Sequence, residues 1–382
     1  MSFDPRCFAV ATAGFGTFIN LYSPQALLPA LANEFHVGPS EISALMTAGT
    51  AAIALTAPFT GALADVVGRK RLITTAMFAT VVPTLIMTLA STVPELTLWR
   101  FVQGLLLPPI FTVTVAYIGD EWPRGDVPRI AGLYIAGTST GGFCGRFVPG
   151  LLADHIGWRA AFVVIALMSI VAATIVALTL TKEKHFVRSD GFADSLSQIF
   201  RHLHDPRLLA TYAIGFGVLF NFIATFTYVS FHLAAAPYFF SSTALGALFF
   251  TYLVSSPLVP WVGRGIMLFG RRRFVLGIIA VWIAGALLLL APPVWLILAG
   301  LTLCAVCGML CQAISTGYVT QTAREGRSSA VGLYASIFYI GGSAGAYLTG
   351  FAWTAAGWAG CVAVIVAMQL VMAVVVVRAW EG

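Results

Sequence analysis

Residues 132–158 read GLYIAGTSTGGFCGRFVPGLLADHIGW, and residues 332–358 repeat the pattern as GLYASIFYIGGSAGAYLTGFAWTAAGW. Nine residues are identical at a constant offset of 200 positions; in the first copy they are Gly132, Leu133, Tyr134, Gly141, Gly142, Gly145, Gly150, Gly157 and Trp158. A second pair of stretches, GALADVVGRKR at 61–71 and GRGIMLFGRRR at 263–273, has nearly the same offset. This agreement predicts an internal duplication, in which each half of the chain forms a similar group of helices.

The composition places the chain in a membrane. Of its 382 residues, 59% are hydrophobic and only 9% are charged, whereas soluble globular chains carry about 25% charged residues. About 20 apolar residues suffice to cross a bilayer as a helix. Twelve such spans are predicted, at 8–31, 41–63, 72–92, 95–118, 129–153, 159–180, 208–233, 243–263, 274–292, 294–317, 328–353 and 357–378. We therefore expect an all-α membrane protein with twelve transmembrane helices in two pseudo-symmetric six-helix bundles.

The basic residues predict the orientation of these spans. All but three of the 21 Lys and Arg residues fall on one side of the membrane, and the exceptions are Arg100, Arg146 and Arg159. Loops rich in Lys and Arg are cytoplasmic as a rule. Both termini are thus expected in the cytoplasm, and the net charge of +6 requires no nucleic-acid partner.

One charged stretch divides the chain into parts. We expect an N-terminal bundle at 1–180, a cytoplasmic linker at 181–206 and a C-terminal bundle at 207–382. Within the linker, Phe192, Leu196, Ile199 and Leu203 recur at helical spacing, which indicates either a short amphipathic helix on the membrane surface or a solvated linker. Because each chain holds both bundles, we expect a functional monomer.

A duplication of six-helix halves is typical of carriers that work by alternating access, with the substrate site between the halves near the bilayer midplane. The duplicated spans carry glycines on one helix face. Small residues let helix backbones approach closely, so these faces either slide between the halves or pack statically. The residues concerned are Gly137, Gly141 and Gly145 in the first half and Gly341 and Gly345 in the second.

Two arginines lie inside predicted spans. Arg100 is about five residues from the end of its span, roughly 7–8 Å deep. Arg146 lies in the duplicated stretch, where its counterpart is Ala346. A charge at such depth usually faces a cavity or a partner. Arg146 is expected either to pair with an acid at a helix end, Asp154 or Glu41, or to face the cavity beside Arg100 and attract an anion.

Several motifs resemble those of a known family, the major facilitator superfamily. The first is Gly61-x-Leu63-x-Asp65-x-x-Gly68-Arg69-Lys70-Arg71, and the second is Arg100-Phe101-Val102-Gln103-Gly104. Tyr22, Gln25, Pro29 and the 132–159 run resemble the bacterial arabinose-efflux-like inner-membrane permeases, within the drug and metabolite:proton antiporters. The resemblance covers essentially the whole chain and implies a bacterial inner-membrane location.

The resemblance also implies roles for particular residues. In this family the aspartate matching Asp65 docks on the start of the eleventh helix, here near Ser328, and holds the cytoplasmic side shut. A conformational switch is thus expected at Gly61, Asp65, Gly68, Arg69, Lys70, Gln103 and Gly104. The first, fourth, seventh and tenth helices of the family line the cavity. The candidates for the substrate or proton pathway are Arg100, Arg146, Asn20, Tyr22, Gln25, Asn221, Tyr228 and His232.

Two transport functions are compatible with these residues. The resemblance predicts proton-coupled efflux of a small molecule. However, no Asp or Glu lies in the interior of any predicted span, and the family's antiporter signature in the fifth helix is incomplete. The alternative is therefore an importer or exchanger of a small organic anion that uses Arg100 and Arg146.

An enzyme is not expected, because no serine nucleophile motif, metal-ligand spacing or phosphate-binding loop occurs in the sequence. Cys304, Cys307 and Cys311 share a helix face without an accompanying His or carboxylate, so we expect packing rather than a metal site. No cofactor is expected, and the expected partners are the substrate, protons and membrane lipid.

Overall fold

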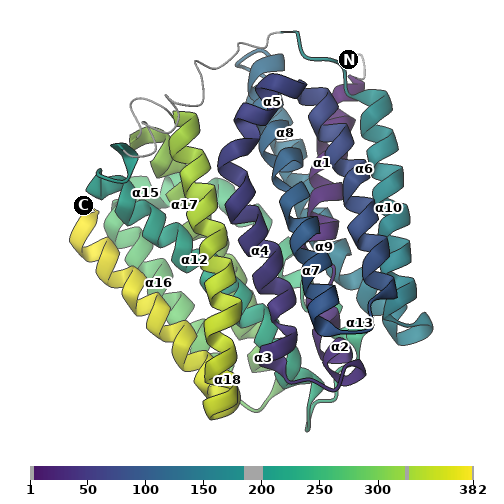
Figure 1. The fold of residues 1–382 in the computed structure, drawn as a ribbon. Helices are drawn as coiled ribbons and strands as arrows, with labels where there is room; N and C mark the ends of the chain where they lie inside the picture. Colours follow the sequence, from purple (N-terminus) through teal and green to yellow (C-terminus); the bar gives the residue numbers. More distant parts are fainter. Residues whose placement is uncertain (1–3, 185–200, 323–326, 381–382) are drawn as a thin grey trace.

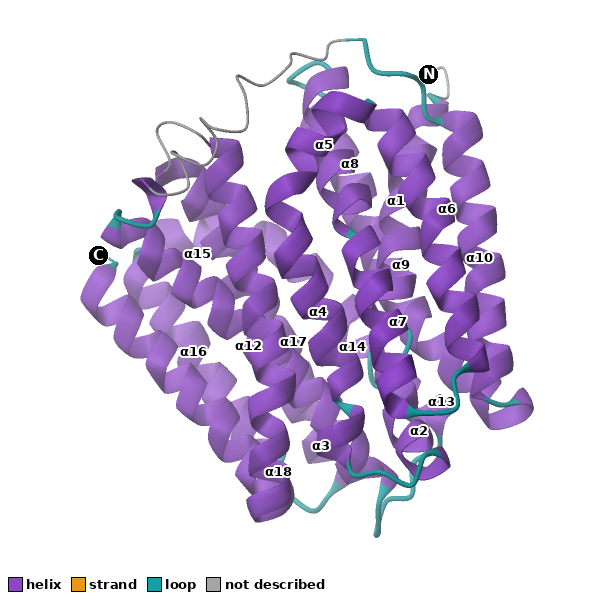
Figure 2. Cartoon of the chain, in the orientation of Figure 1, coloured by secondary structure: helices purple, strands orange, loops and turns teal. Residues whose placement is uncertain are grey.

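The computed structural model describes residues 4–184, 201–322 and 327–380, and these residues form helices and connections without a β-strand (Figure 2). The α-helices are α1 (Pro5–Tyr22), α2 (Leu28–Glu34), α3 (Pro39–Ile42), α4 (Ala44–Thr56), α5 (Thr60–Val67), α6 (Arg69–Ile86), α7 (Val93–Leu106), α8 (Pro108–Glu121), α9 (Val127–Ile156), α10 (Trp158–Thr179), α12 (Pro206–Ala234), α13 (Ser242–Ala247), α14 (Phe250–Ser255), α15 (Val262–Phe269), α16 (Arg271–Leu288), α17 (Val294–Thr322) and α18 (Arg327–Ala379). Short 3₁₀ helices are η1 (Gln25–Leu27), η2 (Ala57–Phe59), η3 (Met87–Leu89) and η4 (Ser256–Trp261).

The helices make twelve crossings. Eight stretches within the described residues are long and apolar enough to span a membrane. One of them, Ala330–Ala379, contains two crossings, because the backbone of α18 leaves helical geometry at Ala356 and Gly357 and turns back. The α1–α2 segment, α9 and α16 also run the length of the bundle (Figure 1). The predicted all-α fold with twelve transmembrane helices is confirmed.

Several crossings that the sequence predicts as continuous are broken at proline. The first crossing stops at Tyr22 and resumes after Pro24 as η1 and α2. The second is interrupted at η2, which contains Pro58, and the fourth is interrupted between α7 and α8 at Pro108. Proline lacks an amide hydrogen and its ring clashes with the preceding turn, so a regular helix does not continue through it. The first break places Tyr22 and Gln25 at an irregular segment deep in the bundle.

Two groups of helices lie side by side (Figure 1). We call residues 4–184, which contain α1–α10, the first half, and residues 201–380, which contain α12–α18, the second half. The two halves meet where α4 packs on α18 and where α9 packs on α13 and α14. We call the end of the bundle with residue 4 and the Gly68 turn the terminal end, and the end with the Gly157 turn the opposite end.

The glycine faces of α9 and α18 pack within their own halves. A methyl group on Gly137, Gly141 or Gly145 would overlap the backbone of α1. Likewise, one on Gly341 or Gly345 would overlap the backbone of α12. The interpretation of these five glycines as sliding faces between the halves is therefore wrong, and they serve the close static packing that small residues permit.

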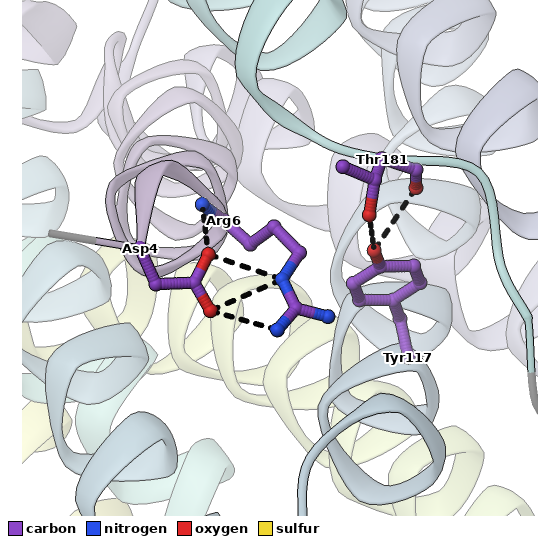
Figure 3. Close-up of polar contacts among 4 residues, drawn as sticks. All are labelled: Asp4, Arg6, Tyr117 and Thr181. Atoms are coloured by element: carbon purple, nitrogen blue, oxygen red, sulfur yellow. Dashed lines mark hydrogen bonds and ion pairs between the residues drawn. The ribbon is translucent and has the colours of Figure 1, made fainter. Parts of the chain in front are cut away.

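The start of the linker is held against the first half at the terminal end. The hydroxyl of Tyr117 on α8 lies 2.9 Å from the carbonyl oxygen of Thr181, to which it donates (Figure 3). Nearby, Arg6 donates to the carboxylate of Asp4 at 2.8 Å, and this hydrogen bond lowers the pKa of the Asp4 carboxyl. The amphipathic pattern from Phe192 to Leu203 falls mainly on 185–200, outside the described residues.

Candidate functional site

Arg146 is buried at the boundary between the two halves. Its side chain, on α9, is 3% exposed. Its Nε donates to Oε1 of Gln25 at 2.8 Å, and one terminal nitrogen donates to the carbonyl of Gly142 at 2.8 Å. Gln25 in turn donates from Nε2 to Oγ1 of Thr227 on α12, at 3.3 Å, and so joins the first half to the second. Within the described residues, Arg146 forms no ion pair with Asp154 or Glu41.

Three aromatic rings surround the Arg146 guanidinium. Its central carbon lies 3.7 Å from the ring centroid of Tyr22, 4.2 Å from that of Phe249 and 5.0 Å from that of Tyr252. A cation over an aromatic face is attracted by the negative π surface. Tyr22 belongs to the first half, whereas Phe249 and Tyr252 belong to the second. We call Tyr22, Gln25, Arg146, Phe249 and Tyr252 the arginine cage.

The sequence predicts three members of this cage, Tyr22, Gln25 and Arg146, and misses the other two. Phe249 and Tyr252 lie in the apolar span predicted at 243–263 and are three residues apart, so they share a helix face. Aromatic residues are common in apolar spans, and nothing in that spacing indicates a cationic neighbour. Their contact with Arg146 depends on how α9 packs against the second half.

Arg100 is also buried, at 1% exposure, but its hydrogen bonds go to residues of the first half. It donates to the carbonyl of Asn20 at 2.8 Å, to the carbonyl of Leu21, and to Oε1 of Gln103. The two carbonyls belong to the last turn of α1, where unpaired oxygens and the helix dipole favour a cation. Arg100 therefore stabilises the broken end of the first crossing, directly beside Tyr22.

A buried polar network surrounds this point within the first half. Asn20 donates from Nδ2 to Oγ of Ser169 at 2.8 Å, and its Oδ1 accepts from Gln103 at 3.1 Å and from Thr84 at 3.2 Å. Gln103 and Asn20 are both fully buried. Burying a polar group is costly unless it is hydrogen-bonded. This network brings together four crossings of the first half and fixes the position of the α1 end.

The predicted residues of α12 are dispersed. Tyr228 lies at the boundary: its hydroxyl contacts the carbonyl of Ala346 at 2.7 Å and Oγ of Ser43, from the first half, at 2.9 Å. Asn221 instead lies within the second half and donates to the carbonyl of Gly217 at 2.8 Å. The ring of His232 stacks on Trp358 with centroids 5.2 Å apart, also inside the second half. Of these three, Tyr228 is the one whose hydrogen bonds, within the described part of the chain, reach both halves.

The 61–71 motif forms a tight turn at the terminal end. Gly68 has a φ of +90°, a backbone conformation that favours glycine. The carboxylate of Glu183 accepts from the backbone amides of Arg69 at 3.0 Å and Lys70 at 3.2 Å, at the start of α6. Arg69 also forms an ion pair with Asp120. This turn is thereby connected to both α8 and the start of the linker.

Other members of the predicted switch have different surroundings. Gly61 lies inside α5 and a methyl group there would meet open space, so it does not form the turn. Gly104 packs so closely on α4 that a methyl group would lie 2.7 Å from Cβ of Ala52. The contact predicted between Asp65 and the start of the eleventh helix near Ser328 involves side chains at 327–329, which lie outside the described part of the structure. No group of three or more His, Cys, Asp or Glu able to hold a metal ion occurs in the described part of the chain.

Comparisons with known proteins agree with this architecture. Residues 8–268 match the family described as Major Facilitator Superfamily. The inner membrane transport protein YnfM of Escherichia coli (strain K12) is 30% identical over 369 residues, which cover 96% of this chain and 88% of that protein. An uncharacterized transporter of Buchnera aphidicola subsp. Schizaphis graminum is 29% identical over 359 residues, covering 94% of this chain and 87% of that protein.

A solved structure with the same fold is a bacterial homologue of the human lysosomal transporter Spinster, in an inward-facing and unoccupied conformation. It is similar to this chain with a TM-score of 0.76 and 16% sequence identity, covering 99% of this chain and 95% of that chain. At this level of identity the likeness shows a shared arrangement of helices.

Proposed function

The chain belongs to the Major Facilitator Superfamily and is a multi-pass membrane transporter, not an enzyme, and we propose that it moves a small organic anion across the bacterial inner membrane by alternating access. The arginine cage is the proposed substrate site. It lies at the boundary between the halves, which is where carriers with duplicated halves bind their substrates.

The observation that carries the proposal is the charge of Arg146. A guanidinium stays protonated in proteins, and burying a charge is costly unless it is paired and hydrogen-bonded. Arg146 has a glutamine, a backbone carbonyl and aromatic rings around it, but no carboxylate among the described residues. A substrate carboxylate would supply the missing negative charge. Arginine suits this role because its planar fork can bind a carboxylate through two parallel hydrogen bonds.

Aromatic side chains near the cage favour an organic rather than an inorganic anion. Besides the cage rings, Phe111 of the first half lies 5.8 Å from Tyr339 of the second half, centroid to centroid. Binding sites for small organic molecules are lined mainly by apolar and aromatic groups, with a few polar groups that orient the ligand. A carboxylate attached to an apolar or planar body fits this surface.

For direction and coupling we propose proton-coupled efflux, as the motif resemblance predicts. The 61–71 motif and Arg100-Phe101-Val102-Gln103-Gly104 support it, because they resemble those of proton-coupled exporters. Because the predicted spans have no interior acid, the proton would travel with the substrate, through Asp120, Glu41 or Glu34 at the helix ends, or through His232. The distribution of basic residues supports a cytoplasmic terminal end, and the presence of both halves in one chain supports a functional monomer.

We also propose that the 61–71 turn is the switch that closes the terminal end, with Asp65 docking on the second half. The Gly68 turn and the ion pair of Arg69 with Asp120 support a rigid unit at this place, and Gly104 permits close packing of α7 on α4 farther along the bundle. Replacing Asp65 by Asn should favour opening at the terminal end. Unchanged labelling of single cysteines at both ends of the bundle would contradict this role.

Transport into and out of proteoliposomes tests the anion proposal. A panel of carboxylates, neutral analogues and organic cations should be supplied with and without a pH gradient. We expect the wild type to transport carboxylates and not organic cations. The same panel should be measured with Arg146→Gln. Arg159→Gln is the matched control, because Arg159 is exposed and pairs with Glu34 at 2.9 Å. Transport of cations alone, or equal transport by Arg146→Gln, would rule out the proposed site.

A further inference from the structure

Asp154 joins the two halves at the opposite end of the bundle. It lies in the last turn of α9, in the first half. Its Oδ1 accepts from the backbone amide of Ser242 at 3.0 Å, and its Oδ2 accepts from that of Thr243 at 2.8 Å. Both amides belong to the first turn of α13, in the second half. The first amides of a helix have no partner within it, so a carboxylate there satisfies donors that otherwise depend on water.

The surrounding backbones are in close contact. A methyl group on Gly150 would overlap the carbonyl of Ser242, and one on Gly246 of α13 would lie 2.8 Å from the carbonyl oxygen of Arg146. The α9 and α13 backbones therefore touch at two points along α9, between Arg146 and the Asp154 contact. Asp154 follows Arg146 by eight residues on the same helix, about 12 Å along its axis. Movement at the arginine cage and at Asp154 is thus carried by one helix, α9.

Hydrogen bonds stabilise the negative charge on Asp154. Partial burial acts to raise the pKa of its carboxyl, but the hydrogen bonds from Thr243, Ser241 and Ser242 outweigh that effect and lower the pKa to about 2. The carboxylate is therefore ionised throughout the physiological pH range. Two other carboxylates at this end accept hydrogen bonds from residues of the first half. Glu34 pairs with Arg159, and Glu95 accepts from Ser91.

Only one copy of the duplicated stretch has a carboxylate at this position. At the offset of 200 positions, the counterpart of Asp154 is Thr354, which donates to the carbonyl of Gly350 in its own helix at 3.1 Å. Arg146 is matched by Ala346 in the same way, and Asp65 is matched by Met267. All three charged residues thus occur in the first half alone.

We propose that Asp154 is a positioning residue for alternating access, whose carboxylate on the first turn of α13 holds the opposite end closed and must be released before that end opens. This role rests on the proposed function. Other contacts between the halves lie at the same end of the bundle. For example, the hydroxyl of Tyr228 lies 2.9 Å from Oγ of Ser43. Asp154 supplies the charged contact at this end, while Asp65 is proposed to act at the terminal end.

Two variants test the contact from its two sides. Asp154→Asn removes the charge and leaves the shape of the side chain nearly unchanged. Ser242→Pro removes one of the two amide donors, and because Ser242 is the first residue of α13, proline is compatible with the helix at that position. Glu95→Gln is the matched control, since it neutralises a carboxylate at the same end that accepts from Ser91 within its own half.

The measurement is the distance between spin labels across the opposite end, at Asn33→Cys in the first half and Ala355→Cys in the second. The background should lack the partly buried Cys7 and Cys144. We expect Asp154→Asn to raise the ratio of open to closed populations about tenfold, and Ser242→Pro to raise it less. The double variant should change the ratio little more than Asp154→Asn alone, because both changes disrupt one contact.

Unchanged populations in Asp154→Asn, or an equal shift in Glu95→Gln, would overturn the role of Asp154. So would full additivity of Asp154→Asn and Ser242→Pro. These results are independent of the substrate, because the distances are measured without transport. A wild-type protein that moves no anion would contradict the proposed function and leave the Asp154 result standing.

Discussion

The guanidinium carbon of Arg146 lies 5.0 Å from the ring centroid of Tyr252, and this contact crosses the boundary between the two halves. Rocking of one half against the other would separate the charge from that ring while leaving Arg146 beside Tyr22, its neighbour in the first half. A bound carboxylate would compensate for the lost contact. Substrate binding and the movement of the halves would then share one side chain.

Arg146→Lys and Arg146→Gln should both impair transport of the carboxylate substrate. A charged hydrogen bond of this kind contributes about 1.5–3 kcal/mol, so the apparent affinity should fall about 10- to 100-fold in Arg146→Gln. Lysine keeps the charge but lacks the planar fork, and its defect should be intermediate. Initial rates over a range of substrate concentrations provide the measurement, with Arg159→Gln behaving as wild type. Normal affinity in Arg146→Gln would exclude a direct contact with the anion.

Arg100→Lys should reduce stability more than it changes specificity. Lysine ends in a compact ammonium and lacks the planar fork that reaches the carbonyls of Asn20 and Leu21 and Oε1 of Gln103. Buried acceptors should therefore lose their donor, at a cost of about 1–3 kcal/mol each. Thermal unfolding in detergent should show a clearly lower midpoint. Arg124→Lys, at an exposed position, is the control. If Arg100→Lys kept wild-type stability and lost transport alone, Arg100 would belong to the substrate or proton pathway instead.

Gly141→Ala and Gly341→Ala should destabilise the protein, because a methyl group at either position overlaps the backbone of the neighbouring helix. Overpacking typically costs about 1–3 kcal/mol. Gly132→Ala and Gly332→Ala are matched controls on the same helices, where a methyl group meets nothing within 4 Å. These controls should be neutral or stabilising by up to about 1 kcal/mol, since alanine is the better helix former. Thermal unfolding of all four variants gives the comparison, and equal stability within each pair would contradict the packing described.

Titration of Asp154 should not change the fraction of molecules that are closed at the opposite end between pH 5 and 8. The pKa of its carboxyl is lowered from 3.8 to about 2 in the closed arrangement. A lowered pKa favours the closed state at all pH values above about 4, and this advantage is lost only as the pH falls from 4 toward 2. Spin-label distances at several pH values provide the test. A transition near pH 6 that Asp154→Asn abolishes would show that this carboxyl titrates in the physiological range.

Much of the fold could be predicted from sequence because its causes are local. The apolar spans predict crossings from composition alone, and the offset between 132–158 and 332–358 predicts two related halves. The turn at Gly68 was also predictable, since a glycine between two helical stretches permits a positive φ. The breaks at Pro24, Pro58 and Pro108 were less so, because membrane helices often accommodate proline when neighbouring helices satisfy the freed backbone groups.

The surroundings of the two arginines could not be predicted in the same way. Arg100 and Arg146 were both predicted as buried charges, and for Arg146 the sequence left open an acid partner or the cavity. The structure places Arg100 on the carbonyl ends of α1 and surrounds Arg146 with rings from both halves. Apart from Gln103 and Gly142, their hydrogen-bond partners lie about 80 to 120 positions away along the chain, and no local pattern relates such residues.

By itself, the sequence determined that this chain is a duplicated, twelve-helix membrane protein with three charged residues, Asp65, Arg146 and Asp154, that one half has and the other lacks. Hydropathy and internal repetition suffice for that, because each is a property of the chain alone. Only the tertiary structure decided what two of these charges meet: a ring cage for Arg146 and the first turn of α13 for Asp154. Those contacts depend on how whole helices pack, and packing is set by shape and burial summed over many residues.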